Sequence, residues 1–133
     1  MSDATTEYYY TKTIDLSPEE AEARVREELE EEGFGVLTEI DVKATLKKKL
    51  DEDMRPYKIL GACNPPYAHK ALEAENKIGT MLPCNVIVQA TGDGRTEVAA
   101  VDPVASMQAV NNEALRPIAE EIRDRLRRVI DRV

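Results

Sequence analysis

The sequence has few of the residues that mark common catalytic or metal sites. Its 133 residues include one histidine, two cysteines, one phenylalanine and no tryptophan. Two cysteines are too few for a disulfide scaffold, and with one histidine they fall short of the roughly four ligands of a structural zinc site. No Ser-His-Asp order, phosphate-binding glycine loop or dinucleotide fingerprint occurs. These absences argue against the common hydrolase, kinase and dehydrogenase classes, and we expect no cofactor.

Long apolar runs and an excess of positive charge are also missing. No run approaches the roughly 18 to 20 apolar residues that cross a bilayer, and residues 1–6 lack the basic and apolar parts of a secretory signal. Eighteen basic residues against twenty-six acidic ones give a net charge of −8, which repels nucleic-acid phosphates and anionic membranes alike. We therefore expect a cytoplasmic protein that binds neither nucleic acid nor membranes.

The length predicts one domain, residues 1–133, of which residues 1–6 form a disordered tail. Changes in hydrophobic period predict the element order β-α-β-α-β-α-β-β-α. The expected strands are 8–14, 35–40, 57–62, 84–90 and 96–101, and the expected helices are 18–32, 42–50, 67–75 and a last helix between 115 and 133. This order predicts an α+β fold of two layers, in which helices pack on a mixed β-sheet.

Local signals mark the ends of the first helix. Ser17 and Glu20 can form a capping box, Pro18 suits the first helical position, and Gly33 suits a left-handed stop. The acidic run from Glu27 to Glu32 is interpreted as a solvated helix face rather than a metal or partner site.

The stretch from residue 57 to residue 103 holds both cysteines and the histidine. Its motifs, in order, are Ile59-Leu60-Gly61-Ala62-Cys63-Asn64-Pro65, Ile78-Gly79, Leu82-Pro83-Cys84-Asn85-Val86 and Asp102-Pro103. Together and in this order they resemble the prokaryotic domain-of-unknown-function family 302. The resemblance covers most of the chain and implies a compact α+β domain, often a homodimer, with no established activity.

Cys63 is the candidate nucleophile or soft-metal ligand. It lies where a strand ends and a helix begins, so backbone amides and the positive end of the helix dipole favour its thiolate. The favoured interpretation, however, is that Cys63, and still more Cys84 at the start of an apolar strand, is a small buried core residue. The spacing also allows, without requiring it, that Cys63, Cys84 and Met107 hold a soft monovalent copper ion.

Four polar residues near the cysteines complete the candidate site. Asn64, Asn85 and Asp102 flank strand ends, where they either cap helices and form turns or line a small polar pocket with Cys63. His69 follows Cys63 by about a turn and a half, and it either serves as a base for the thiol or faces solvent. The surface position is the favoured one.

The sequence favours a homodimeric domain that binds a small molecule or a partner and has no catalytic machinery. The alternative is a thiol protein that uses Cys63, with or without Cys84, for redox exchange, sulfur transfer or soft-metal handling. A third hypothesis is structural self-association without an accessible pocket. Replacing Cys63 by serine distinguishes the first two hypotheses, because only a thiol protein loses its function.

Overall fold

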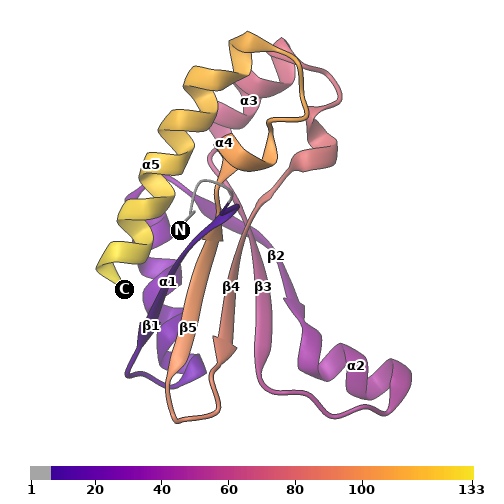
Figure 1. Ribbon diagram of the computed structural model, residues 1–133, viewed down its shortest axis with the longest axis vertical. Helices are drawn as coiled ribbons and strands as arrows, with labels where there is room; N and C mark the ends of the chain where they lie inside the picture. The colour runs from indigo at the N-terminus through magenta and orange to yellow at the C-terminus, as the bar shows by residue number, and fades with distance from the viewer. Residues whose placement is uncertain (1–6) are drawn as a thin grey trace.

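Five antiparallel strands form one sheet in the order β1-β5-β4-β3-β2 (Figure 1). A computed structural model describes residues 7–133, so the expected tail, residues 1–6, lies outside the described part. The strands are β1 (Tyr9–Ile14), β2 (Gly35–Asp41), β3 (Tyr57–Cys63), β4 (Cys84–Ala90) and β5 (Thr96–Val101). The α+β class and the order of the main elements are confirmed.

The sheet is antiparallel throughout rather than mixed, which corrects the expected strand pairing. The two strands joined by the first helix, β1 and β2, lie at opposite edges of the sheet and do not pair. The strands joined by the later helices, β2 with β3 and β3 with β4, run in opposite directions as neighbours. No helix therefore serves as the crossover that parallel neighbours need.

Seven helical segments connect or follow the strands in residues 7–133. They are α1 (Pro18–Glu31), α2 (Val42–Leu50), α3 (Pro65–Ala74), the 3-10 turn η2 (Ile78–Met81), α4 (Pro103–Ser106), the 3-10 turn η3 (Glu113–Leu115) and α5 (Arg116–Arg132). The predicted signals at the ends of α1 are confirmed, because Ser17 and Glu20 form the capping box and Gly33 has a φ of 87°. None of these helices is long and apolar enough to span a membrane.

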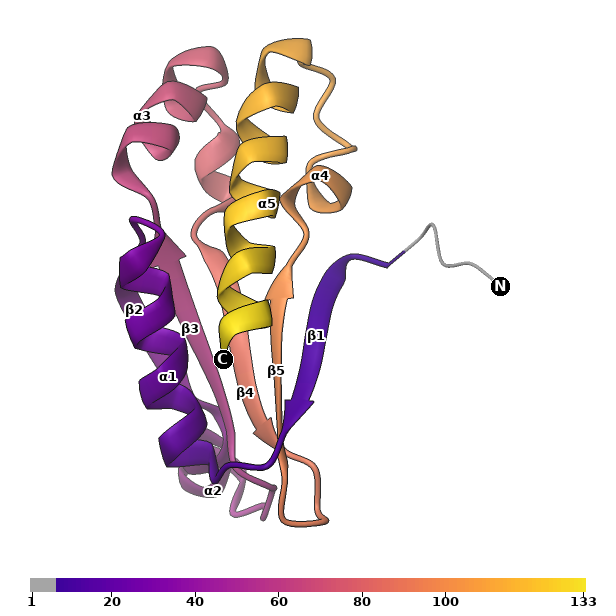
Figure 2. The same ribbon diagram turned by 90° about the vertical axis from the view of Figure 1, so that its left-hand side faces the viewer.

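The core lies between one face of the sheet and the two long helices, α1 and α5 (Figure 2). Helix α1 contributes Ala21, Val25 and Leu29 at a spacing of four residues, and all three are fully buried. Alternate residues of the strands meet them, since successive strand side chains point to opposite faces. Burying each large apolar side chain contributes about 1.5 to 3 kcal/mol to the stability of the fold. The packing of α1 and α5 on the sheet therefore holds the strand ends in fixed positions.

The remaining helices extend beyond the two ends of the sheet. Helix α3, helix α4 and the start of α5 lie past the end at which β3 stops and β4 starts, whereas α2 projects from the other end (Figure 1). Because both cysteines lie at the first of these ends, the candidate site is bounded by helices on one side and by the sheet on the other.

Candidate functional site

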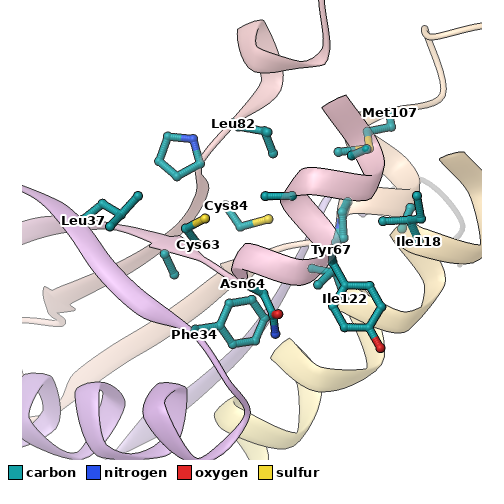
Figure 3. A pocket seen from close by; sticks show the side chains of 16 residues that line it. Phe34, Leu37, Cys63, Asn64, Tyr67, Leu82, Cys84, Met107, Ile118 and Ile122 are labelled. Carbon is teal, nitrogen blue, oxygen red and sulfur yellow. The ribbon is translucent and has the colours of Figure 1, made fainter. Parts of the chain in front are cut away.

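A pocket of about 260 Å³ lies where the ends of β3 and β4 meet α3, α4 and α5 (Figure 3). Its walls are apolar or sulfur-bearing side chains with one amide and one phenol among them: Phe34, Leu37, Ala62, Cys63, Asn64, Tyr67, Ala68, Ala71, Leu82, Pro83, Cys84, Pro103, Met107, Ile118, Ala119 and Ile122. For comparison, a dry cavity of about 150 Å³ lined by apolar side chains accepts benzene. The pocket therefore has the size and the lining to hold a small organic molecule.

The two cysteines meet in this pocket. Cys63 is the last residue of β3 and Cys84 the first of β4, and Ala62 pairs with Cys84 in the sheet. Both side chains line the pocket as free thiols, Cys63 half-buried and Cys84 buried. Burial, and to a smaller extent the neighbouring Cys63, raise the pKa of Cys84 to about 11. Cys84 consequently stays protonated at neutral pH, and Cys63 is the accessible sulfur of the pair.

Asn64 is the one residue with a side-chain amide among those that line the pocket. Its side chain does not cap the following helix, which is the role that its position in the sequence suggests. It occupies the N-cap position of α3 without making a side-chain capping bond. Its Nδ2 instead donates to the backbone oxygen of Glu32 at 3.1 Å, and the residue is only 6% exposed. A Cβ on Gly33 would come within 3.2 Å of this Nδ2, so the glycine both makes the left-handed turn and leaves room for the amide.

Glu32 anchors the turn that holds Asn64, and sequence reasoning missed it. Its carboxylate accepts two bonds from Arg128, each 3.1 Å long, and one from Arg132 of 2.8 Å. The bonds from Arg128, opposed by burial, lower the pKa of Glu32. The interpretation of Glu27 to Glu32 as a solvated face is therefore wrong at Glu32. The signal in the sequence was the spacing of Arg125, Arg128 and Arg132, which places three cations along α5.

The structure does not bring the other predicted polar residues to the two thiols. Asn85 lies on the opposite face of the sheet, where it lines a different cavity. Asp102 caps α4 by accepting from the amide of Val104 at 2.9 Å, and it also contacts Arg127. His69 is exposed, as favoured. The expected polar pocket of Cys63 with Asn85 and Asp102 does not form; Asn64 alone joins the thiols.

A metal site is not evident in the described structure. Among residues 7–133 no group of three or more histidine, cysteine and carboxylate side chains is arranged to hold a metal ion. Met107 lines the same pocket as the two cysteines, so the three sulfur side chains do share one cavity.

Comparison with known proteins assigns the chain to a family. The model of the family described as "Domain of unknown function DUF302" matches residues 10–133. The chain belongs to the DUF302 family. Its structure is similar to the crystal structure of an uncharacterised conserved DUF302 protein from Bacillus stearothermophilus, with 33% sequence identity, coverage of 94% of this chain and 97% of that chain, and a TM-score of 0.87. None of the curated proteins compared matches the chain.

The two cysteine motifs of this DUF302 chain lie next to each other at the pocket. Gly61, in the first cysteine motif, pairs with Asn85 of the second. A Cβ on Gly61 would collide with Thr38 and would lie 2.7 Å from Cγ of Pro83. Only a glycine lets the segment before Cys84 approach β3 this closely, which places the two cysteine motifs side by side.

Proposed function

We propose that this DUF302 domain binds a small, largely apolar molecule in the pocket at the ends of β3 and β4. The observation that supports it is the pocket itself, an apolar cavity of about 260 Å³ with a few polar atoms, which is the usual form of a small-molecule site. Scaled from the cavity that accepts benzene, it suits a ligand of about ten non-hydrogen atoms. Ligands of this size bind with dissociation constants from about the micromolar to the millimolar range.

The proposal is tested by titrating 2-naphthol into a solution of the protein and following the fluorescence of the naphthol. The chain contains no tryptophan, so the protein contributes little background. The deciding variant is Ala71→Leu, because Ala71 lines the pocket and is 3% exposed, and a leucine there fills part of the cavity. The matched control is Ala23→Leu at an exposed position of α1.

We expect saturable binding by the wild-type protein, at least tenfold weaker binding by Ala71→Leu, and unchanged binding by Ala23→Leu. Circular dichroism establishes that each variant is folded. No binding by the wild-type protein up to about 1 mM naphthol, or equal binding by a folded Ala71→Leu variant, would sink the proposal.

A second candidate function is thiol chemistry at Cys63. It is supported by the position of Cys63, half-buried in the pocket wall beside Cys84 and two residues before the start of α3. Because the pKa of Cys84 is raised to about 11, Cys63 rather than Cys84 supplies the reactive sulfur at neutral pH. Alkylation with iodoacetamide at pH 7, followed by mass spectrometry, tests this. Rapid labelling of Cys63, suppressed by a pocket ligand, supports a thiol role, and a Cys63 that reacts only after unfolding rules it out.

We further propose that the domain works as a homodimer through the face of the sheet that α1 and α5 leave uncovered (Figure 1). That face has an apolar centre of Tyr9, Ile87 and Ala99, which line a cavity of about 430 Å³ there. Next to it projects α2, which carries four lysines and no buried residue, while all twenty-six acidic residues lie outside α2. Lys47 pairs with Asp51 and Asp53 of its own chain, and the other three lysines suit the net negative charge of a second copy.

Sedimentation equilibrium tests the dimer. We expect twice the monomer mass for the wild-type protein and the monomer mass for Ile40→Glu, since Ile40 lies in β2 and is 48% exposed. Leu72→Glu, at a 44% exposed position of α3, is the control that stays dimeric. A wild-type monomer at about 100 μM would argue against self-association through any surface.

A further inference from the structure

The side-chain amide of Asn64 is hydrogen-bonded through only one of its two ends within residues 7–133. Oδ1 of Asn64 accepts no hydrogen bond from any residue between 7 and 133, although the side chain is only 6% exposed and lines the cavity. Buried polar atoms in proteins nearly always have a partner, so an unpaired acceptor in a pocket wall calls for an explanation.

The orientation of this amide follows from its neighbours. The backbone oxygen of Glu32 can only accept, so the atom of Asn64 that faces it at 3.1 Å must be Nδ2. Arg125 donates to the same oxygen at 3.0 Å and holds it in place. The Oδ1 atom is therefore the end of the amide that remains available to another molecule.

The first turn of α3 also has an unused donor. Pro65 and Pro66 occupy its first two positions and have no N–H group. The next amide, that of Tyr67, makes no hydrogen bond within the described residues, because the side chain of Asn64 is engaged with Glu32 instead of capping the helix. An unpaired acceptor and an unpaired donor thus belong to two residues, Asn64 and Tyr67, that both line the pocket.

Three sulfur atoms complete the surroundings. Cys63, Cys84 and Met107 line the same cavity, and divalent sulfur makes favourable contacts with the edges of aromatic rings. The sulfur side chains and the apolar walls therefore suit an aromatic ring.

We infer that the ligand of the pocket is a small phenol, whose hydroxyl group donates a hydrogen bond to Oδ1 of Asn64. This inference rests on the proposed function, namely that the pocket binds an apolar molecule. A hydroxyl suits the site because it can donate the hydrogen bond that Oδ1 accepts, while the aromatic ring of the phenol suits the apolar walls.

The test compares ligands that differ only in the donor. Wild-type protein is titrated with 2-naphthol, 2-methoxynaphthalene and naphthalene, and the same series is repeated with Asn64→Ala. In this variant the oxygen of Glu32 keeps its bond from Arg125, so the turn retains one anchor. Asn85→Ala, on the other face of the sheet, is the matched control.

We expect the wild-type protein and Asn85→Ala to bind 2-naphthol about fivefold more tightly than either reference ligand, the effect of one net hydrogen bond. Asn64→Ala should bind all three ligands equally. Equal affinities in the wild-type protein overturn the inference while the proposed function stands, whereas absence of all binding defeats the proposed function. A preference for naphthol that persists in Asn64→Ala also overturns the inference, because another group would then hold the hydroxyl. If Asn64→Ala does not fold, the three affinities of the wild-type protein decide alone.

Discussion

Replacing Glu32 by glutamine tests the link between the ends of α1 and α5. Glutamine keeps the shape of the side chain and removes its negative charge. In the wild-type protein this carboxylate is 9% exposed and accepts three hydrogen bonds from Arg128 and Arg132. The variant therefore leaves two guanidinium groups without their counter-charge and weakens the support of the turn that holds Asn64.

The expected loss of stability lies between two limits. Breaking a fully buried ion pair costs about 3 to 5 kcal/mol, and an exposed pair contributes about 0 to 1 kcal/mol. Here the carboxylate is buried, but the side chains of Arg128 and Arg132 are 44% and 50% exposed, so water screens them. We expect Glu32→Gln to lower the free energy of unfolding by about 2 kcal/mol, which moves the urea midpoint by about 1 M.

The effect has a defined dependence on pH. Arg128, by hydrogen bonding and charge, lowers the pKa of Glu32 in the folded protein. A lowered pKa contributes stability that is present above the pKa of the unfolded chain, about 4.3, and is lost as the pH falls through the folded value. The difference between wild-type and Glu32→Gln proteins should thus be largest at pH 7 and shrink below about pH 4.

Urea unfolding followed by circular dichroism at pH 7 and at pH 3 measures both effects. The control is Glu31→Gln, the neighbouring exposed position, which should change the stability by less than about 0.5 kcal/mol. Equal stabilities of the Glu32 and Glu31 variants, or a loss that is as large at pH 3 as at pH 7, would refute the assignment of the ion cluster.

Three further predictions concern the sheet and its cysteines. Because the pKa of Cys84 is raised to about 11, its alkylation in the native protein should stay slow at pH 8 and become fast in urea; fast native labelling at pH 8 would show that Cys84 is not buried. Gly61→Ala should lower the free energy of unfolding by about 1 to 3 kcal/mol, because the new Cβ would collide with Thr38 and Pro83. The control in the same urea experiment is Gly79→Ala, which has open space around it. Equal losses of stability in the two variants would contradict the close contact of Gly61 with Thr38 and Pro83. Leu60→Ala, at a fully buried position, should lower the free energy of unfolding by about 2 to 5 kcal/mol. The control is Leu50→Ala, at a 64% exposed position; an equal loss of stability in the two variants would contradict the assigned core.

Much of the local structure was predictable from the sequence, because it depends on residues close together in the chain. Ser17 and Glu20 form the expected box at the start of α1, and Asp41 caps α2 through the amide of Ala44. The hairpin of β4 and β5 is antiparallel, as its short turn requires. The last helix was likewise expected between residues 115 and 133, and α5 spans Arg116–Arg132 with Ile122, Leu126 and Val129 on its buried face.

The candidate site was predictable in part. The sequence singled out Cys63, Cys84 and Asn64, and all three line the pocket. It also grouped Asn85 with them, although Asn85 follows Cys84 directly in a strand and so must point to the other face of the sheet. Applying that alternation to β4 would have excluded it from the sequence alone.

Only the tertiary structure decided which residues far apart in the chain come into contact. The sequence determined where the strands and the longer helices begin and end to within about two residues, since caps, turns and apolar periods act within a few residues. It did not determine that every strand pairs antiparallel, that Glu32 meets Arg128 and Arg132 across about a hundred positions, or that Asn64 turns from its helix cap to Glu32. These outcomes depend on how α1, α5 and the end of the sheet pack together. That packing leaves the apolar pocket, and it leaves Oδ1 of Asn64 without a hydrogen-bond partner among residues 7–133.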